Sequence, residues 1–380
     1  MRLSNNQQAF LEFVRAGLWG CGNAEIRIDG TTDWEEVYRL AEEQSVMGLI
    51  AAGIDMLPSE ERPPQEVLLQ FIGCALQIEQ QNKDLNAYLS RLIEKLRKED
   101  VYAILVKGQG IAQCYEKPLW RASGDVDLLL NDTNYEKAKK VLTPLALEVE
   151  TEFKSLKHLA MTLKGGFEVE LHGMFHSRLS KRVDKVVDEA QNDIFYGGQV
   201  RLWQNGNTKV FLPSPDSDVI IIFTHILKHF YIEGVGLRQI CDWCRLLWTY
   251  RDSLNHGLLE SRIRKAGLMS EWRGFAALAV DWLGMPEEAM PLYNENDNHN
   301  ANLKRKAERI MEFVLESGNF GHNRVIPRSN NIFVGKITAA WLKMHDFARH
   351  ARLFPLDSVR FFIHYALNGI STAQDRLNDK

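Results

Sequence analysis

The stretch LVKGQGIAQCYEKPLWRASGDVDLLL, residues 105–130, decides the fold because it joins two apolar runs through a glycine turn. The first run, VYAILVKG at residues 101–108, is short, rich in β-branched residues and closed by a glycine, which is typical of a buried strand. The second run, GDVDLLL at residues 124–130, predicts another strand, and residues 109–117 between them predict a short helix. This order of elements indicates a small domain that mixes strands and helices.

Three more strand candidates follow a helix that is predicted over residues 133–146. They are LEVETEF, LKHLAMTLK and FEVELHGMF, at residues 147–153, 156–164 and 167–175. Gly165-Gly166 predicts a tight hairpin between the last two, and Asn205-Gly206 predicts the turn of a further hairpin within residues 200–213. Alternating strands and helices followed by a meander of strands predict a mixed sheet.

Apolar residues recur at helical spacing on both sides of this core. Before it, residues 32–57 offer Thr32 or Asp33 as an N-cap, and residues 63–100 carry a pattern long enough for one helix of about thirty residues. We therefore predict an N-terminal helical segment over residues 1–98.

After the core, residues 214–234 predict a helix with Ser214 as its cap and Pro215 as its first residue. Residues 294–305 predict a polar linker, and residues 333–355 predict helix that is rich in aromatic and basic side chains. The whole chain predicts an α+β fold in which a mixed-sheet core is flanked by helical segments. The predicted core covers residues 99–212, and the predicted C-terminal helical domain covers residues 213–380.

The composition is ordinary for a soluble globular protein, with 45% apolar and 25% charged residues. The formal net charge of -4 disfavours a long nucleic acid as partner, because such binding normally needs a basic excess. No apolar run has the length of a membrane span, and the start of the sequence lacks the apolar core of a signal peptide. We therefore expect a cytoplasmic protein without a membrane partner.

The five cysteines are an odd number in a long chain, which fits reduced thiols. Cys241 and Cys244 form one C-x-x-C pair, but no second pair accompanies them. Structural zinc needs four ligands, so we favour a core-facing helix over a zinc site at this pair.

Two of the predicted strands carry acidic residues at alternate positions. Asp125 and Asp127 share one face of their strand, and Glu168, Glu170 and His172 share one face of theirs. If these strands are neighbours, the carboxylates converge, and their repulsion must be relieved by raised pKa values or by bound cations. Clustered oxygen ligands suit Mg²⁺ or Mn²⁺, and two such ions could activate a nucleophile and stabilise a leaving pyrophosphate. The alternative is a strand-entry turn in which the two aspartates accept backbone N–H bonds.

The glycine turn upstream fits phosphate chemistry. Gly108 lets the backbone come close to a phosphate, and the N-terminus of the following helix offers free N–H groups. Lys107 and Arg121 could supply positive charge to phosphate oxygens. The alternatives are that Lys107 is a solvated residue at a strand end and that Arg121 pairs with the neighbouring aspartates.

This order of motifs resembles the nucleotidyltransferase superfamily that includes DNA polymerase beta and the kanamycin nucleotidyltransferases. Residues 105–130, together with VELHGMF at residues 169–175, more closely resemble a bacterial family of uncharacterised nucleotidyltransferases. In that family a Lys-Gly turn precedes an Arg-x-x-x-Asp-h-Asp strand, where h is an apolar residue, and an acidic-Leu-His strand follows. Residues 33–50 and 223–247 are also similar to it, so the resemblance extends over about residues 30–320.

The resemblance implies transfer of a nucleoside monophosphate from an NTP to an acceptor, with loss of pyrophosphate. By position, Asp125, Asp127 and Glu170 would be the catalytic residues and the ligands of two Mg²⁺ or Mn²⁺ ions. The residues predicted to bind substrate are Lys107, Gly108, Gln109, Arg121 and His172. The acceptor could be a small molecule, a protein side chain or the end of a nucleic acid.

Two alternative functions stay open at this point. A metal-dependent glycosyltransferase also uses D-x-D, but it usually carries a larger nucleotide-binding α/β domain before that motif. A catalytically degenerate protein that binds a nucleotide or a partner is the second alternative, because Gln109 stands where the wider superfamily has Gly or Ser.

Two features of the C-terminal helices also invite a functional interpretation. His225 and His229 have a spacing that can bind metal on a helix, but without an H-E-x-x-H motif we favour a helix face that lines the cleft or the core. Asp242 either holds Arg238 one turn away or reaches the active site.

Overall fold

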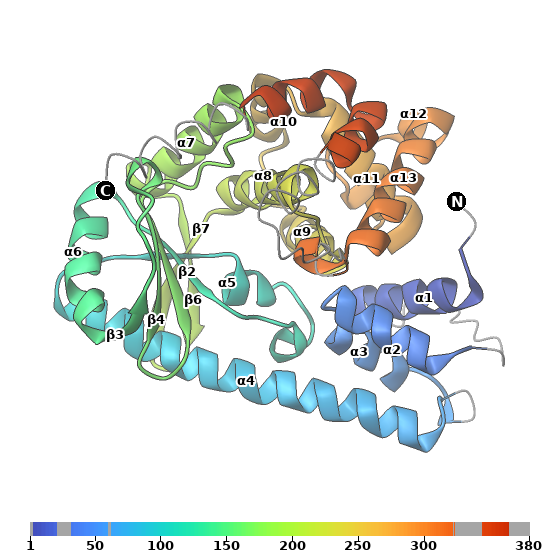
Figure 1. The fold of residues 1–380 in the computed structure, drawn as a ribbon, viewed down its shortest axis with the longest axis horizontal. Coiled ribbons are helices and arrows are strands. Elements are labelled where there is room, and N and C mark those ends of the chain that lie inside the picture. Colours follow the sequence, from blue (N-terminus) through green and yellow to red (C-terminus); the bar gives the residue numbers. More distant parts are fainter. Residues whose placement is uncertain (1–2, 21–31, 60–61, 322, 324–343, 365–380) are drawn as a thin grey trace, which may run out of the picture.

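A seven-stranded mixed sheet and the helices around it organise the chain (Figure 1). The structure is a computed structural model, and it describes residues 3–20, 32–59, 62–321, 323 and 344–364. The strands are β1 Ile104–Val106, β2 Val126–Leu129, β3 Ala146–Val149, β4 His158–Leu163, β5 Glu168–His172, β6 Val200–Asn205 and β7 Thr208–Pro213. The helices before and within the sheet are α1 Asn5–Trp19, α2 Trp34–Glu43, α3 Met47–Asp55, α4 Gln65–Lys98, α5 Gly108–Ala112, α6 Asp132–Leu142 and α7 Lys181–Phe195. The later helices are α8 Pro215–Ile232, α9 Leu237–Tyr250, α10 His256–Ala266, α11 Met269–Leu283, α12 Glu295–Asn298 and α13 Ala301–Ser317.

The strands lie in the order β3-β4-β5-β2-β1-β7-β6, and the sheet is mixed as predicted. Strand β2 is antiparallel to β1 and parallel to β5, whereas β1 is parallel to β7. The register places Asp127 of β2 opposite Glu170 of β5 and opposite Val106 of β1. The two strands that carry the acidic residues are therefore neighbours, which was the condition for their carboxylates to converge.

Both predicted hairpins exist, but each turn differs by one residue from its prediction. Between β4 and β5 the loop holds three residues, 164–166, because the Leu163 N–H donates to the Phe167 carbonyl at 3.1 Å. Between β6 and β7, Asn205 pairs with Thr208, so the turn lies at residues 206–207 and not at Asn205-Gly206. Glycines with positive φ make both turns possible, and a glycine can occupy more than one position of such a turn.

The two faces of the sheet have opposite character. Alternate residues of β2 and β5 pack into an apolar layer against α4 and α6; they are Val126, Leu128, Val169 and Leu171. The same layer holds Leu89 and Leu96 of α4, and each such side chain stabilises the fold by roughly 1.5–3 kcal/mol when fully buried. The opposite face of the same strands carries the acidic residues, as the period-two pattern predicted.

Helix α4 links this apolar layer to the helices before it. It is 34 residues long, as the sequence pattern predicted, and Figure 1 shows it running from beneath the sheet to α2 and α3. Its N-terminal part contributes Phe71 and Ala75 to the core that contains α1 and α3. Residues 32–57 form two helices, with Asp33 as the first N-cap and a break at Ser45, whose φ is 54°.

The C-terminal helices follow the sequence prediction except at one segment. Ser214 caps α8 and Pro215 is its first residue, as predicted, and Cys241 and Cys244 are fully buried in α9. Residues 294–305 are not the predicted linker, because they contain α12 and the start of α13, which the Asn300 side chain caps. Asparagine is a strong N-cap residue, so this asparagine-rich run begins a helix.

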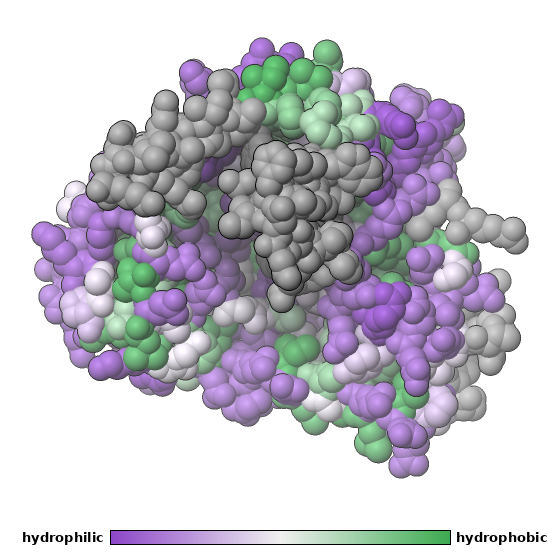
Figure 2. All heavy atoms as spheres, in the orientation of Figure 1, coloured by the Kyte–Doolittle hydropathy of each residue, from purple (hydrophilic) through white to green (hydrophobic). Residues whose placement is uncertain are grey.

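The predicted helix at residues 333–355 is described only from residue 344, where helix runs over 344–353 and again over 355–364. Leu356, Val359 and Ile363 of the second piece are exposed, and apolar side chains gather over these helices at the top of Figure 2. Hydrophilic residues dominate the rest of the coloured surface in that view. Among the described helices, none combines the length and the apolar character needed to cross a bilayer.

Candidate functional site

The parallel pairing of β2 and β5 brings three carboxylates together. Asp125 stands just before β2, Asp127 lies within it, and Glu170 is the register partner of Asp127 on β5. Ligand oxygens of these three residues lie within 4.8 Å of one another. Glu168 lies on the same face but is exposed, and it is not a member of this group. We call Asp125, Asp127 and Glu170 the carboxylate cluster.

A strained turn brings a lysine to this cluster. Lys107, between β1 and α5, has φ 57° and ψ -146°, a conformation that only glycine adopts without cost. Gly108 follows with φ +38°. The turn directs the Lys107 Nζ to 2.8 Å from the Asp127 Oδ1, and the same ammonium lies 5.2 Å from the centre of the Phe175 ring. Backbone strain that is retained in this way is common at binding and catalytic sites.

The electrostatics of the cluster reflect repulsion that is only partly relieved. The charge of Asp127, followed by burial, raises the pKa of Asp125 above its ordinary value, although Lys107 acts in the opposite direction. Burial alone would raise the pKa of Glu170, but hydrogen bonds from His158 and His172 outweigh it and lower that pKa well below the usual range. Three carboxylates therefore share a site whose nearest ammonium is that of Lys107.

Two histidines complete the acidic face. The His172 Nε2 lies 2.8 Å from the Asp127 Oδ1 and 3.1 Å from the Glu170 Oε2, and the His158 Nε2 lies 3.2 Å from the same Glu170 oxygen. Burial lowers the pKa of His172, but hydrogen bonds to Asp127 and Glu170 dominate and raise it. His172 was a predicted site residue, whereas His158 was not recognised from the sequence.

Helix α8 faces the cluster with two basic residues. The His225 ring lies 6.3 Å from the Phe175 ring, and burial followed by the charge of Lys107 lowers the pKa of His225 well below its ordinary value. Burial and the charge of Lys107 also lower the pKa of Lys228, against the attraction of Glu170 and other carboxylates. The favoured interpretation of this helix as a cleft-lining face fits these contacts. Lys228 was missed, although its i, i+3 spacing from His225 was an available signal.

Arg121 is held away from the carboxylate cluster by a partner of its own. Its Nε and Nη2 lie 3.0 and 2.6 Å from the two carboxylate oxygens of Asp242 on α9, and the Tyr115 hydroxyl donates to the same aspartate at 2.7 Å. Asp242 therefore binds Arg121, a role that neither of the two predicted alternatives contained. The side chains of Arg121 and Asp242 are each 7% exposed, so this ion pair is enclosed.

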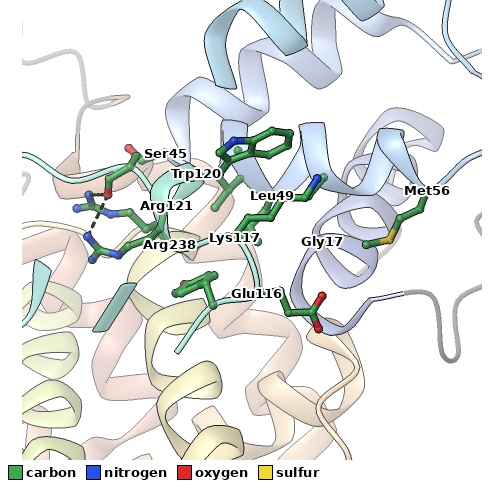
Figure 3. Close-up of a pocket in the computed structure, with 14 residues that line it drawn as sticks. Gly17, Ser45, Leu49, Met56, Glu116, Lys117, Trp120, Arg121 and Arg238 are labelled. Atoms are coloured by element: carbon green, nitrogen blue, oxygen red, sulfur yellow. Dashed lines mark hydrogen bonds between the residues drawn. The ribbon is translucent and has the colours of Figure 1, made fainter. Parts of the chain in front are cut away.

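A pocket borders this ion pair. Figure 3 shows Arg121 and Arg238 at one end of it and Met56 at the other, with Leu49 of α3 between them. Both guanidinium groups donate to the Ala122 carbonyl, which lies on the segment that leads into β2. The pocket therefore lies between helices α1 and α3 and the segment that connects α5 to β2, with Arg238 of α9 at its edge.

The Gln109 side chain serves the packing of the glycine turn. It is 2% exposed, and its Nε2 donates to the Asn82 side chain of α4 at 2.9 Å. Asn82 in turn donates to the Leu119 and Arg121 carbonyls at 2.8 Å each. The structure thus brings Lys107, Gly108 and His172 to the carboxylate cluster, whereas it directs the Gln109 and Arg121 side chains elsewhere.

The carboxylate cluster has the donor set that a divalent cation requires. Three carboxylates with oxygens within 4.8 Å of one another suit hard cations, such as Mg²⁺ or Mn²⁺, which prefer oxygen ligands. Lys107 forms its ion pair with Asp127, and its charge also acts on Asp125 and Glu170, so one ammonium compensates only part of the charge of three carboxylates. Among the described residues, no cluster of three or more potential ligands includes Cys241, Cys244 or His229.

Comparison with known proteins gave one match. The family model described as uncharacterised nucleotidyltransferase matches residues 30–284, a stretch that contains the entire sheet and helices α2 to α11. No curated protein and no solved structure matches the chain.

Proposed function

Because the chain belongs to the uncharacterised nucleotidyltransferase family, we propose that it transfers a nucleoside monophosphate from an NTP to an acceptor and releases pyrophosphate. The observation that carries the proposal is the carboxylate cluster, in which oxygens from two adjacent strands lie within 4.8 Å of one another. Such a cluster binds cations, and cation-bound carboxylates are the means by which proteins hold and cleave a triphosphate.

In this proposal, Asp125, Asp127 and Glu170 hold two divalent ions, Mg²⁺ or Mn²⁺. When bound, the ions would lower the pKa of the acceptor hydroxyl and neutralise charge on the leaving pyrophosphate. The acceptor oxygen forms a bond to the α-phosphorus, and the bond from that phosphorus to the bridging oxygen breaks. The acceptor proton leaves with solvent or with a basic group of the site.

The basic side chains around the cluster fit the phosphates of the NTP. Lys107 already lies at the cluster edge, where it can contact phosphate oxygens that approach the carboxylates. Lys228 of α8 is close enough that the charges of Glu170 and Asp127 act on its pKa. Gly108 leaves no side chain between the turn and a phosphate. Burial lowers the pKa of Lys228, and an anion bound beside it would act in the opposite direction.

The two alternatives are less well supported. A glycosyltransferase would need a larger nucleotide-binding α/β domain ahead of the D-x-D strand, but the described residues before β1 form helices α1 to α4. A protein that binds the nucleotide without turnover is compatible with the buried Gln109, which takes the place of the Gly or Ser of the wider superfamily. The decisive experiment must therefore separate binding from transfer.

Calorimetric titration with each of the four NTPs, in Mg²⁺ or Mn²⁺, tests the proposal. At least one NTP should bind only with the divalent ion, and the Asp125→Asn/Asp127→Asn double variant should lose about 100-fold in affinity, equivalent to about 2.7 kcal/mol. Asp132→Asn is a matched control, because Asp132 is 76% exposed and pairs with Lys157 outside the cluster.

Three outcomes decide between the functions. The proposal fails if no NTP binds, or if the double variant binds as well as the wild type. Binding of a nucleotide sugar in place of an NTP would instead support the glycosyltransferase. NTP binding without pyrophosphate release, in the presence of a broad panel of acceptors, would support the nucleotide-binding protein.

A further inference from the structure

A second group of potential metal ligands adjoins the carboxylate cluster and differs from it in chemistry. Ligand atoms of His158, Glu170 and His172 lie within 4.8 Å of one another. The group is built by the antiparallel pairing of β4 and β5, in which His158 and His172 are register partners. Their rings lie 4.8 Å apart, and the Nε2 atoms of both are within 3.2 Å of the Glu170 Oε2. Two ring nitrogens thus converge on one carboxylate oxygen.

Hydrogen bonds alone do not account well for the way the two histidines and the carboxylates come together. The Nε2 of a histidine carries at most one hydrogen. The His172 Nε2 nevertheless faces two oxygens, the Asp127 Oδ1 at 2.8 Å and the Glu170 Oε2 at 3.1 Å. That single hydrogen cannot point along both directions, and the same Glu170 oxygen is also approached by His158. Two ring nitrogens and a carboxylate oxygen this close together can instead share one metal ion.

The separations also match those between ligands of one ion. Nitrogen and oxygen ligands lie about 2.0–2.2 Å from a bound transition-metal ion, which places neighbouring ligand atoms about 3.0–3.5 Å apart. The nitrogen–oxygen separations from His158 and His172 to Glu170 are 3.2 and 3.1 Å. The His158 and Glu170 side chains are 25% and 22% exposed, so an ion could enter from solvent.

We propose that His158, Glu170 and His172 bind one divalent transition-metal ion, such as Mn²⁺ or Zn²⁺, in preference to Mg²⁺. Two imidazoles and one carboxylate select ions that accept nitrogen ligands, whereas Mg²⁺ prefers oxygen alone. Because Glu170 belongs to both groups, the ion lies beside the carboxylate cluster, and its site is additional to the two ions proposed there. Its role next to an NTP rests on the proposed function, but its binding does not.

Pulsed EPR of Mn²⁺ added to the wild-type protein, in the absence of any nucleotide, tests the site directly. Coupling to ¹⁴N of imidazole is expected in the bound ion, and a tenfold excess of Mg²⁺ should leave that coupling in place. His158→Gln should lower the affinity for Mn²⁺ at least tenfold, as should His172→Gln. His176→Gln is the matched control, because His176 is also partly exposed and paired with a carboxylate, that of Asp188 at 2.7 Å.

The wild-type spectrum alone can overturn the site, so the test does not depend on whether a variant folds. Bound Mn²⁺ without ¹⁴N coupling, or coupling that Mg²⁺ abolishes, would refute it. Unchanged affinity in both histidine variants, once thermal melting shows that they are folded, would refute it as well. A protein that binds no NTP but gives the ¹⁴N signal would lose the proposed function and keep this metal site.

Discussion

Carboxylates occupy two regions of this molecule, and the two regions compensate their charge in opposite ways. On the sheet, Asp125, Asp127 and Glu170 face one another across adjacent strands. In the helices, Asp242 of α9 and Glu271 of α11 are 5% and 0% exposed, and each has a hydrogen-bond partner of its own. Asp127 of the sheet is 1% exposed, so the depth of burial does not separate the two regions.

The difference shows that burial of an acid does not by itself mark a functional site. Asp242 is neutralised by Arg121 at 2.6 Å, and Glu271 accepts a hydrogen bond from Tyr231 at 3.0 Å. Burial raises the pKa of Glu271 to about 8, so that acid keeps its proton near neutral pH. The charge of Asp357 adds to the effect of burial on that pKa. Asp125 differs because it belongs to a group of three carboxylates, with Asp127 raising its pKa most. Mutual repulsion that the fold leaves in place is the feature that points to a bound cation.

The largest expected effect is the pH dependence of the free energy of unfolding that comes from Glu271. Its pKa in the folded protein is about 8, against an ordinary value of 4.5, so the folded state retains a proton that the unfolded state releases. The stability from this group is therefore complete below about pH 4.5 and is lost as the pH rises to 8, by on the order of 5 kcal/mol.

The Glu271→Gln variant isolates that contribution, because glutamine mimics the protonated acid at every pH. Urea unfolding of both proteins at pH 5 and pH 8 should give a free-energy difference that shifts in favour of the variant at the higher pH. An equal difference at the two pH values would show that Glu271 is charged in the fold, as the sheet acids are proposed to be.

Breaking the enclosed ion pair should have the next largest effect. Arg121→Met leaves Asp242 buried without its counter-charge. Urea titration should show that the free energy of unfolding falls by about 3–5 kcal/mol, the typical cost of breaking a buried ion pair. The double variant Arg121→Met/Asp242→Leu removes both charges and should recover most of the loss. If Arg121→Met instead weakened NTP binding without destabilising the protein, Arg121 would return to the predicted set of substrate-binding residues.

Local patterns in the sequence were sufficient to predict which strand face carries the acidic residues of the sheet. The alternation of polar and apolar residues in GDVDLLL and FEVELHG placed Asp125, Asp127 and Glu170 on their faces, since side-chain direction in a strand has a period of two. The Arg121–Asp242 pair had no such signal, because 121 positions separate its members and only the packing of α9 beside the glycine turn brings them together.

The same period explains why His158 was missed. A two-residue turn at Gly165-Gly166 would pair His158 with Gly173, whereas the three-residue loop pairs it with His172. A shift of one residue moves every side chain of the strand to the other face of the sheet. The hairpin itself was predictable, but the face on which His158 lies depended on the length of its loop, which the glycine pair left undetermined.

The smallest expected effect separates two glutamates that the sequence could not distinguish. Glu168 and Glu170 share a face of β5, but only Glu170 is the register partner of Asp127, and Glu168 is exposed and paired in register with Thr162. Glu168→Gln should change the affinity for Mn²⁺ less than about threefold, because solvent screens an exposed charge beside the cluster. Glu170→Gln should lower it at least tenfold, because a ligand oxygen loses its charge. The measurement is a Mn²⁺ titration of both variants. Equal losses of affinity would mean that the total negative charge near the cluster attracts the ion, and that the pairing of Glu170 with Asp127 does not matter. The sheet acids would then differ from the enclosed acids only in net charge.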